Sequence, residues 1–133
     1  MDEVRLRAYT SAMRVLLLTK DLLLGSQING AASAAGCDVQ EVLSANSLRK
    51  AIDQEPAKFI VIDLTCPGVR DELGELVPHL KSQPSPPTVI AYGPHVQEGA
   101  LATASEAGCD RVMTRGQLHR ELGSLFGSAD GHE

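Results

Sequence analysis

The sequence is poor in aromatic residues, in basic residues and in long apolar runs. Aromatic side chains make up 3% of the 133 residues and tryptophan is absent, so the core has to be aliphatic. Twelve basic residues against 17 acidic ones give a net charge of -5. That balance argues against a protein that follows nucleic-acid phosphates along a basic stripe. No apolar run approaches the roughly 20 residues of a membrane helix, so we expect no membrane partner.

Several site and targeting signals are also missing. The three cysteines are an odd number without paired spacing, which suits a reducing compartment better than a disulfide framework. The first five residues lack the basic start and apolar centre of a signal peptide. Gly-x-Gly-x-x-Gly, Walker and Cys-x-x-Cys motifs are absent, which argues against the usual nucleotide-binding and thioredoxin-like proteins. We therefore expect a cytoplasmic protein.

Short apolar runs alternate along the chain with segments of helical spacing. The runs, expected to be strands, cover residues 15–18, 39–43, 59–62, 89–92 and 111–114. The helical stripes between and after them fall within residues 24–35, 48–52, 73–80, 100–107 and 118–126. Five such strand–helix units predict an α/β domain with a doubly wound five-stranded parallel sheet in the order 2-1-3-4-5.

We place this domain at residues 13–127, between an N-terminal tail (1–12) and a C-terminal tail (128–133). Val4, Leu6 and Tyr9 are the residues through which the first tail could dock. Ligands of such folds bind beyond the carboxyl ends of the strands. The candidate site residues at those ends are Thr19, Lys20, Asp21, Asp63, Thr65, Gly93 and Arg115.

One segment resembles a known family. Residues 59–68, Phe-Ile-Val-Ile-Asp-Leu-Thr-Cys-Pro-Gly, look like the third strand and following loop of response-regulator receiver domains. The order and lengths of the elements are similar from residue 14 to residue 126. The resemblance implies the flavodoxin-like receiver fold and a place in bacterial two-component signal transduction. It also implies that Asp63 stands where the family has its phosphoacceptor.

The other site positions depart from the family pattern. Receiver domains end their first strand with two acidic residues that hold a magnesium ion. The matching positions here are Thr19 and Lys20, with Asp21 just beyond. The hydroxyl residue that ends the family's fourth strand is matched by Gly93, and the lysine that ends its fifth strand by Arg115.

These departures bear directly on phosphoryl transfer to a carboxylate. The acceptor and the phosphoryl group are both anionic, so the reaction depends on metal ions and cationic groups that neutralise charge. Mg²⁺ prefers hard oxygen ligands, and only Asp63 and Asp21 are weak candidates. We predict instead that Lys20 lies beside Asp63, with Arg115 as a second cation. A fixed ion-pair cluster would then replace a metal-dependent switch.

The sequence favours a pseudo-receiver: not an enzyme, without a cofactor, and acting by protein–protein interaction independently of phosphorylation. The resemblance implies a contact face made by the fourth helix (100–107), the fifth strand (111–114) and the fifth helix (118–126). A second copy of the chain is one candidate partner there. His95, Glu98, Arg111 and Arg120 are expected on or beside that face.

Two alternatives stay open. The first is a functional receiver phosphorylated on Asp63 in a phosphorelay, which would need Mg²⁺. The second is a small-molecule binding domain that uses the crevice at the strand ends, an idea that rests on the fold alone. Tyr92 is the sole aromatic residue near that edge, which argues against a stacked flavin-like ligand.

Overall fold

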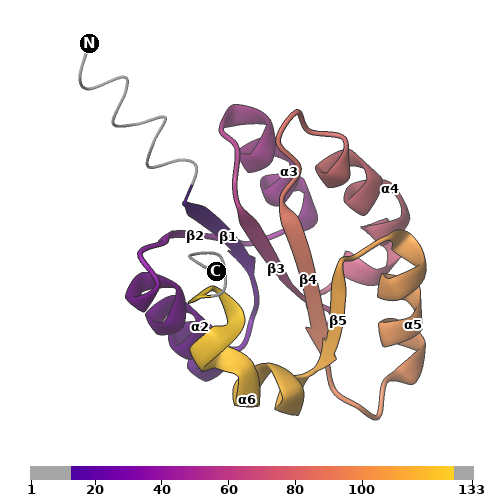
Figure 1. The fold of residues 1–133 in the computed structure, drawn as a ribbon. Coiled ribbons are helices and arrows are strands. Elements are labelled where there is room, and N and C mark those ends of the chain that lie inside the picture. The colour runs from indigo at the N-terminus through magenta and orange to yellow at the C-terminus, as the bar shows by residue number, and fades with distance from the viewer. Residues whose placement is uncertain (1–12, 128–133) are drawn as a thin grey trace.

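The structure is a computed structural model that describes residues 13–127. The expectations for the two tails, including docking through Val4, Leu6 and Tyr9, concern residues outside this range. Within it, five parallel strands form one sheet in the order β2-β1-β3-β4-β5, as predicted (Figure 1). The strands are β1 (Arg14–Leu18), β2 (Asp38–Val42), β3 (Phe59–Asp63), β4 (Thr88–Gly93) and β5 (Arg111–Thr114).

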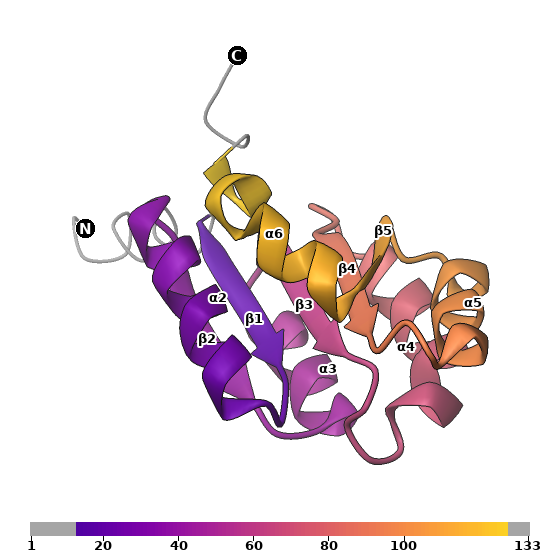
Figure 2. The same ribbon diagram turned by 90° about the horizontal axis from the view of Figure 1, so that it is seen from below.

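Five helices cover the two faces of the sheet (Figures 1 and 2). One face carries α2 and α6, and the other carries α3, α4 and α5. None of the helices in the described part of the chain is long and apolar enough to cross a membrane. The helices are α2 (Leu22–Ala34), α3 (Ala45–Gln54), α4 (Val69–Lys81), α5 (Glu98–Ala107) and α6 (Arg115–Leu125).

The core consists of two aliphatic layers, one on each side of the sheet. Successive residues of a strand point to opposite faces, so Leu16 and Leu18 join the layer under α3, α4 and α5. Val15 and Leu17 join the layer under α2 and α6. All four are at most 1% exposed. This burial on both faces explains why the central strands read as unbroken apolar runs.

Strand β2 lies one residue earlier than predicted. The apolar run suggested residues 39–43, but the strand is Asp38–Val42 and Leu43 is 90% exposed. Val42 is the last residue of β2 that pairs with β1, opposite Leu18. The chain then turns at once into α3, because the Ser44 side chain accepts a hydrogen bond from the Ser47 amide. β2 is an edge strand, and most of its residues are not buried. The apolar pattern of the sequence therefore locates the end of this strand less precisely than it does for a central strand.

A buried arginine lies at the amino-terminal end of β1. Arg14, at the start of β1, is 6% exposed. Its guanidinium donates to the carbonyl oxygens of Ala51 (3.3 Å) and Glu55 (2.7 Å), and to the side chain of Gln40. Two of these acceptors belong to the end of α3, where carbonyl groups lack partners within the helix. Arg14 thus links the end of α3 to β1 and β2 at the amino-terminal ends of the strands, which is the end of the sheet away from the candidate site.

Candidate functional site

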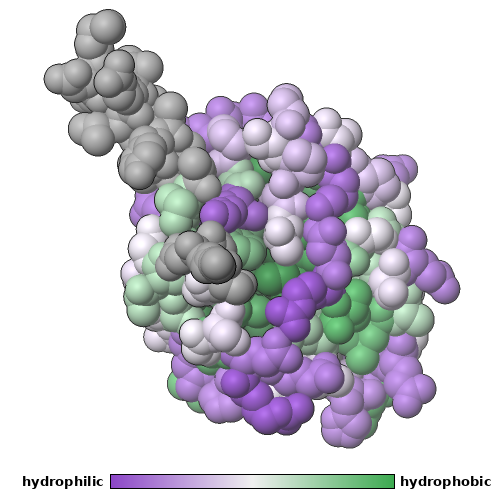
Figure 3. Space-filling view, viewed as in Figure 1, coloured by the Kyte–Doolittle hydropathy of each residue, from purple (hydrophilic) through white to green (hydrophobic). Residues whose placement is uncertain are grey.

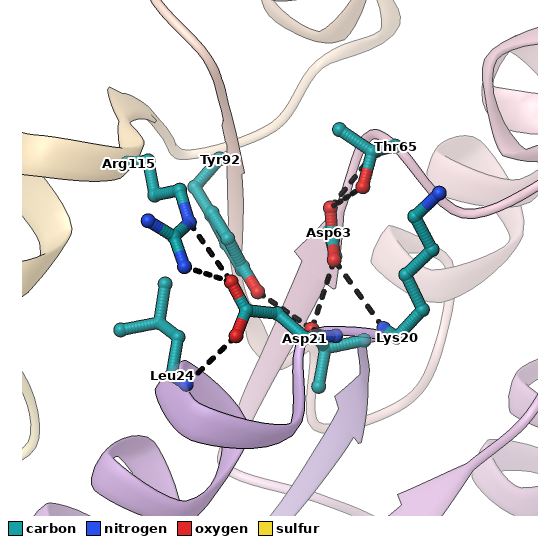
Figure 4. A network of polar contacts seen from close by, with 8 residues as sticks. Lys20, Asp21, Leu24, Asp63, Thr65, Tyr92 and Arg115 are labelled. Carbon is teal, nitrogen blue, oxygen red and sulfur yellow. Dashed lines mark hydrogen bonds and ion pairs between the residues drawn. The ribbon is translucent and has the colours of Figure 1, made fainter.

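The sequence-predicted residues lie at the carboxyl ends of the strands, and Figure 4 shows Lys20, Asp21, Asp63, Thr65 and Arg115 among them. Thr19, Lys20 and Asp21 follow β1, and Asp63 is the last residue of β3. Gly93 ends β4, and Arg115 begins α6 directly after β5. Hydrogen bonds link Asp63 to Thr65 and to the residues after β1, and Asp21 to Arg115. The parallel order of β1, β3 and β4 brings these segments together.

Asp63 is buried and fully engaged by hydrogen bonds. Asp63 is 2% exposed to solvent. One carboxylate oxygen, Oδ1, accepts from the amide (2.9 Å) and the hydroxyl (2.7 Å) of Thr65. The other, Oδ2, accepts from the Thr19 hydroxyl (2.9 Å) and the Lys20 amide (3.3 Å). The charge of Asp63 is therefore met by hydroxyl and amide groups of the loops after β1 and β3.

Thr19 connects Asp63 to Tyr92. The Thr19 hydroxyl has one proton, which it donates to Asp63. The Tyr92 hydroxyl lies 2.7 Å from Thr19 Oγ1, so Tyr92 donates the proton of that bond. The Asp21 amide also donates to Thr19, at 3.0 Å. Burial raises the pKa of Tyr92, which keeps the phenol protonated as this chain of bonds requires.

Tyr92 was not predicted as a site residue, although the sequence contained a signal for it. In the parallel pairing of β3 and β4, Tyr92 lies directly opposite Asp63. The hydroxyl group of a buried tyrosine usually has a hydrogen-bond partner, and Tyr92 lies next to the last residue of β4. Here that partner is Thr19.

The predicted ion-pair cluster around Asp63 is wrong. Among the described residues, no ion pair joins Lys20 or Arg115 to Asp63. Lys20 donates a hydrogen bond to Asp63 through its backbone amide, and no interaction joins its side-chain nitrogen to the carboxylate in Figure 4. Lys20 is exposed, so its ammonium group keeps the hydration that a buried ion pair would remove.

Arg115 pairs with Asp21 instead. Its Nε lies 2.9 Å from Asp21 Oδ2, and its Nη2 contacts the same oxygen. Asp21 Oδ1 accepts from the Leu24 amide at 2.9 Å, so Asp21 is the N-cap of α2. The Leu24 amide, followed by Arg115, lowers the pKa of Asp21. Asp21 is therefore held at the start of the helix and turned away from Asp63.

Gly93 lies close to the side chain of Leu64. A Cβ atom at Gly93 would lie 3.4 Å from the Cβ of Leu64. Beside this contact a groove of about 620 Å³ opens, whose lining includes Lys20, Thr65 and Cys66. Burial, followed by the nearby charge of Asp63, raises the pKa of the Cys66 thiol to about 11. The thiol is thus protonated at neutral pH and unreactive, since the thiolate is the reactive form.

The residues at this site do not fit a magnesium ion. Mg²⁺ takes several oxygen ligands in octahedral geometry. Both oxygens of Asp63 already accept two hydrogen bonds each, and Asp21 is engaged by Leu24 and Arg115. Across residues 13–127, no group of three or more histidine, cysteine or acidic residues could hold a metal ion.

Comparison with known proteins identifies the fold. No protein-family model and no curated protein matches the chain. An orphan response regulator of H. pylori matches with a TM-score of 0.68 and 18% identity, over 90% of this chain and 95% of that chain. A putative response regulator from Chloroflexus aurantiacus matches with a TM-score of 0.69 and 16% identity, over 84% and 91%.

A third match has a metal ion in its structure. The receiver domain of a sensor histidine kinase from Pseudomonas aeruginosa matches with a TM-score of 0.67 and 16% identity, over 88% of this chain and 99% of that chain. That protein has a magnesium ion coordinated in its active-site cleft. Together with the strand order, these matches show that the chain has the fold of response-regulator receiver domains.

Proposed function

We propose that this chain is a receiver-like signalling module that acts through protein–protein contacts and does not accept phosphate on Asp63. The observation that carries the proposal is the state of Asp63, which is 2% exposed with both oxygens hydrogen-bonded twice. A carboxylate that attacks a phosphoryl group needs an accessible oxygen and nearby groups that neutralise the combined negative charge.

The cost of freeing Asp63 supports the proposal. A hydrogen bond to a charged group contributes about 1.5–3 kcal/mol. An incoming phosphoryl group would have to displace Thr19 and the Lys20 amide from Oδ2, or both Thr65 donors from Oδ1. In a receiver with an acidic pair, a metal ion could replace the lost donors. Here the corresponding positions are a threonine and a lysine.

The face of α5, β5 and α6 is the contact surface that the family resemblance implies. His95, Glu98, Arg111 and Arg120 are all exposed. Arg111 and Glu121 form an ion pair of 2.7 Å across this face. Mixed charges in exposed positions favour partner choice and orientation over raw affinity. We assign this face to a protein partner with complementary charges, and a second copy of the chain is one candidate.

A phosphorylated receiver remains the second candidate function, because one observation favours it. Asp63 ends β3 beside the groove of about 620 Å³, whose charged lining residues are the basic Lys20 and Arg70 and the acidic Asp71. The excess of one positive charge in this lining would attract an anionic phosphoryl donor. In that case Asp63 would accept the phosphoryl group on one carboxylate oxygen after the hydrogen bonds to that oxygen had broken.

Amide NMR spectra distinguish the two functions. Spectra would be recorded with Mg²⁺ and then with Mg²⁺ plus beryllofluoride, a mimic of the phosphoryl group. The proposal expects no specific shifts around Asp63 and Thr65. Shifts that are present in the wild type and absent in Asp63→Asn would mean that the site binds the mimic, and the proposed function would be wrong.

A further inference from the structure

The groove beside Asp63 lies among three segments at the carboxyl ends of the strands. These segments are the loop after β1, the loop from β3 into the first turn of α4, and the first half of α5. In Figure 3 the lower rim of the molecule, where the strands of Figure 1 end, is largely purple and therefore hydrophilic. The groove has a volume of about 620 Å³, and small-molecule sites have volumes of about 300–1,000 Å³. The groove is therefore large enough for a small ligand.

Three of the side chains that line the groove have no partner among the residues that the structure describes. The ammonium group of Lys20, the guanidinium group of Arg70 and the side-chain amide of Gln97 take part in no hydrogen bond or ion pair there. Gln97 is the N-cap residue of α5, yet its side chain makes no capping bond. Each of the three groups carries N–H donors, so the groove offers free donors from all three segments.

The side chain of Arg70 reaches from α4 to the beginning of α5. A Cβ atom at Gly99, in the first turn of α5, would lie 3.3 Å from Nη2 of Arg70. The missing side chain at Gly99 thus leaves the room that the guanidinium group occupies. Arg70 is thereby placed against α5 on the side of the groove where Gln97 lies.

The charge of the lining favours an anion. Its charged residues are Lys20, Arg70 and Asp71, which leaves an excess of one positive charge in a protein whose net charge is -5. The nearby carboxylate of Asp63 is 2% exposed and accepts four hydrogen bonds, which offset part of its negative charge. Ammonium and guanidinium groups have no lone pair with which to bind a metal cation. The free groups of the groove therefore fit a ligand that supplies acceptors.

A phosphate group matches these donors better than a carboxylate does. A phosphate ester carries a charge of about -1.5 to -2 and three strong acceptor oxygens, whereas a carboxylate has two oxygens and a single charge. Arginine binds phosphate through paired N–H groups, and lysine binds it as a point charge. Free donors on Lys20, Arg70 and Gln97 can each engage one of the three oxygens. The volume of the groove leaves space for the rest of a small molecule.

We propose that this groove reversibly binds a small molecule that carries a phosphate group, with Lys20, Arg70 and Gln97 donating hydrogen bonds to the phosphate oxygens. No covalent bond forms and no metal ion takes part. The inference rests on the proposed function in one respect, because the phosphate group stays on its ligand and is not transferred to Asp63. It adds that the module responds to an anion that it binds and releases unchanged.

Amide NMR titrations of the full chain with inorganic phosphate and with AMP test this inference. Both titrations are made in EDTA at constant ionic strength, and potassium acetate is the control for negative charge alone. We expect saturable shifts at the amides of Lys20, Arg70 and Gln97 with both phosphate compounds. AMP has an organic part that inorganic phosphate lacks, so the ratio of the two dissociation constants distinguishes an esterified phosphate from a free one.

Neutral variants identify the groups that hold the phosphate. Lys20→Met and Arg70→Met should each raise the dissociation constant at least about fivefold, since each removes a charged hydrogen-bond donor. Lys50→Met is the matched control, because Lys50 is an exposed lysine of α3 that does not line the groove. It removes the same charge and should leave the dissociation constant unchanged. Circular dichroism verifies that the three variants are folded.

Each outcome supports or overturns the inference. Binding that Lys20→Met and Arg70→Met weaken and Lys50→Met does not supports it. Equal weakening by all three variants would mean that the anion responds to overall charge, and shifts of equal size with acetate would mean that the groove does not select phosphate. Either result overturns the inference. The absence of shifts with both phosphate compounds also overturns it, and leaves the proposed function as it stands.

Asp63→Asn separates a failure of this inference from a failure of the proposed function. The variant lacks a negative charge beside the groove, so it should bind AMP and inorganic phosphate at least as tightly as the wild type does. Shifts that appear only when Mg²⁺ replaces EDTA, and that are lost in Asp63→Asn, would mean that a metal ion at Asp63 holds the phosphate. That result would overturn the inference and the proposed function together.

Discussion

The Nε atom of Arg115 lies 2.9 Å from Oδ2 of Asp21, although the two residues are 94 positions apart in the chain. Asp21 is the N-cap of α2, and Arg115 is the first residue of α6. The contact therefore joins the first turns of the two helices that cover the same face of the sheet. The same hydrogen bond raises the pKa of Arg115. One carboxylate, that of Asp21, thus caps α2 and binds the first residue of α6.

We predict that the cap matters more than the ion pair. Asp21→Ala should lower the free energy of unfolding by about 1 kcal/mol, since it removes the acceptor for the Leu24 amide. Asp21→Asn keeps a capping oxygen and should cost less. Arg115→Gln should also cost less than about 1 kcal/mol, because exposed ion pairs contribute little. Urea unfolding of the three variants provides the ranking, and equal losses for Asp21→Ala and Asp21→Asn would contradict it.

The pH dependence of stability should identify Asp21 in the same variants. Its pKa in the folded protein is lowered from the ordinary value of 3.8. A lowered pKa means that the ionised form stabilises the fold above that value, and that this stabilisation is lost as the pH falls through the folded-state pKa. The stability difference between wild type and Asp21→Asn should therefore be constant near neutral pH and shrink below about pH 3.8. A difference that grows on acidification would contradict the assignment.

The bonds from Tyr92 to Thr19 and from Thr19 to Asp63 should be coupled in energy. Tyr92→Phe removes one hydroxyl and should cost about 1 kcal/mol. Thr19→Val removes a donor to the buried carboxylate and should cost about 1–3 kcal/mol. Because the two hydroxyls contact each other, the double variant should lose less than the sum of the single losses, by about 0.5 kcal/mol or more.

A double-mutant cycle measured by urea unfolding checks this coupling. Tyr92→Phe combined with Ser44→Ala is the control, because the Ser44 side chain is the N-cap of the distant helix α3 and accepts from the Ser47 amide. Those two losses should add. Strict additivity for Tyr92 and Thr19 as well would mean that the hydroxyl contact contributes nothing.

Arg14 should be the most costly arginine to replace. Arg14→Met leaves the carbonyl groups of Ala51 and Glu55 without their donor at a buried position. We expect a loss of about 2–3 kcal/mol in the free energy of unfolding. Arg70→Met, on the exposed side of α4, should change it by no more than about 0.5 kcal/mol. Thermal and urea unfolding of both variants check the difference, and similar losses would refute the structural role of Arg14.

The fold was largely predictable because the central strands are buried on both faces. Residues 15–18 of β1 and 59–62 of β3 are unbroken apolar runs, and the alternation of such runs with helical stripes allows few arrangements of a parallel sheet. The edge strand was less predictable. Val39 and Val42 are separated by polar residues, and the exposed Leu43 extended the apolar run by one position beyond the paired residues.

The site was predictable in its residues and not in its contacts. The carboxyl ends of parallel strands lie on the same side of a sheet, which predicted that Asp63, Asp21 and Arg115 would lie near one another. Opposite charges alone suggested that Arg115 would pair with Asp63. They did not reveal that Thr19 and Thr65 satisfy Asp63 with hydroxyl groups, which leaves Arg115 to Asp21. Such preferences depend on loop geometry, which the apolar pattern does not encode.

Restoring an acidic pair after β1 should create metal binding. In Thr19→Asp/Lys20→Asp, the hydroxyl that donates to Asp63 Oδ2 is lost and two carboxylates are added near that oxygen. Without metal, we expect this variant to be less stable than the wild type, since like charges gather at a buried site. With Mg²⁺ at ten times its dissociation constant, the variant should gain about 1.4 kcal/mol. The wild type should gain nothing comparable.

Thermal unfolding with and without Mg²⁺ measures both effects. The matched control is Thr19→Asn/Lys20→Asn, which has nearly the same shape without the added charge. If Mg²⁺ stabilised the control or the wild type as much as the acidic variant, the cation would be binding elsewhere or Asp63 would already coordinate it. Either result would contradict the prediction that Thr19 and Lys20 keep Mg²⁺ from binding beside Asp63. If only the acidic variant responds, two substitutions separate this site from one that binds Mg²⁺.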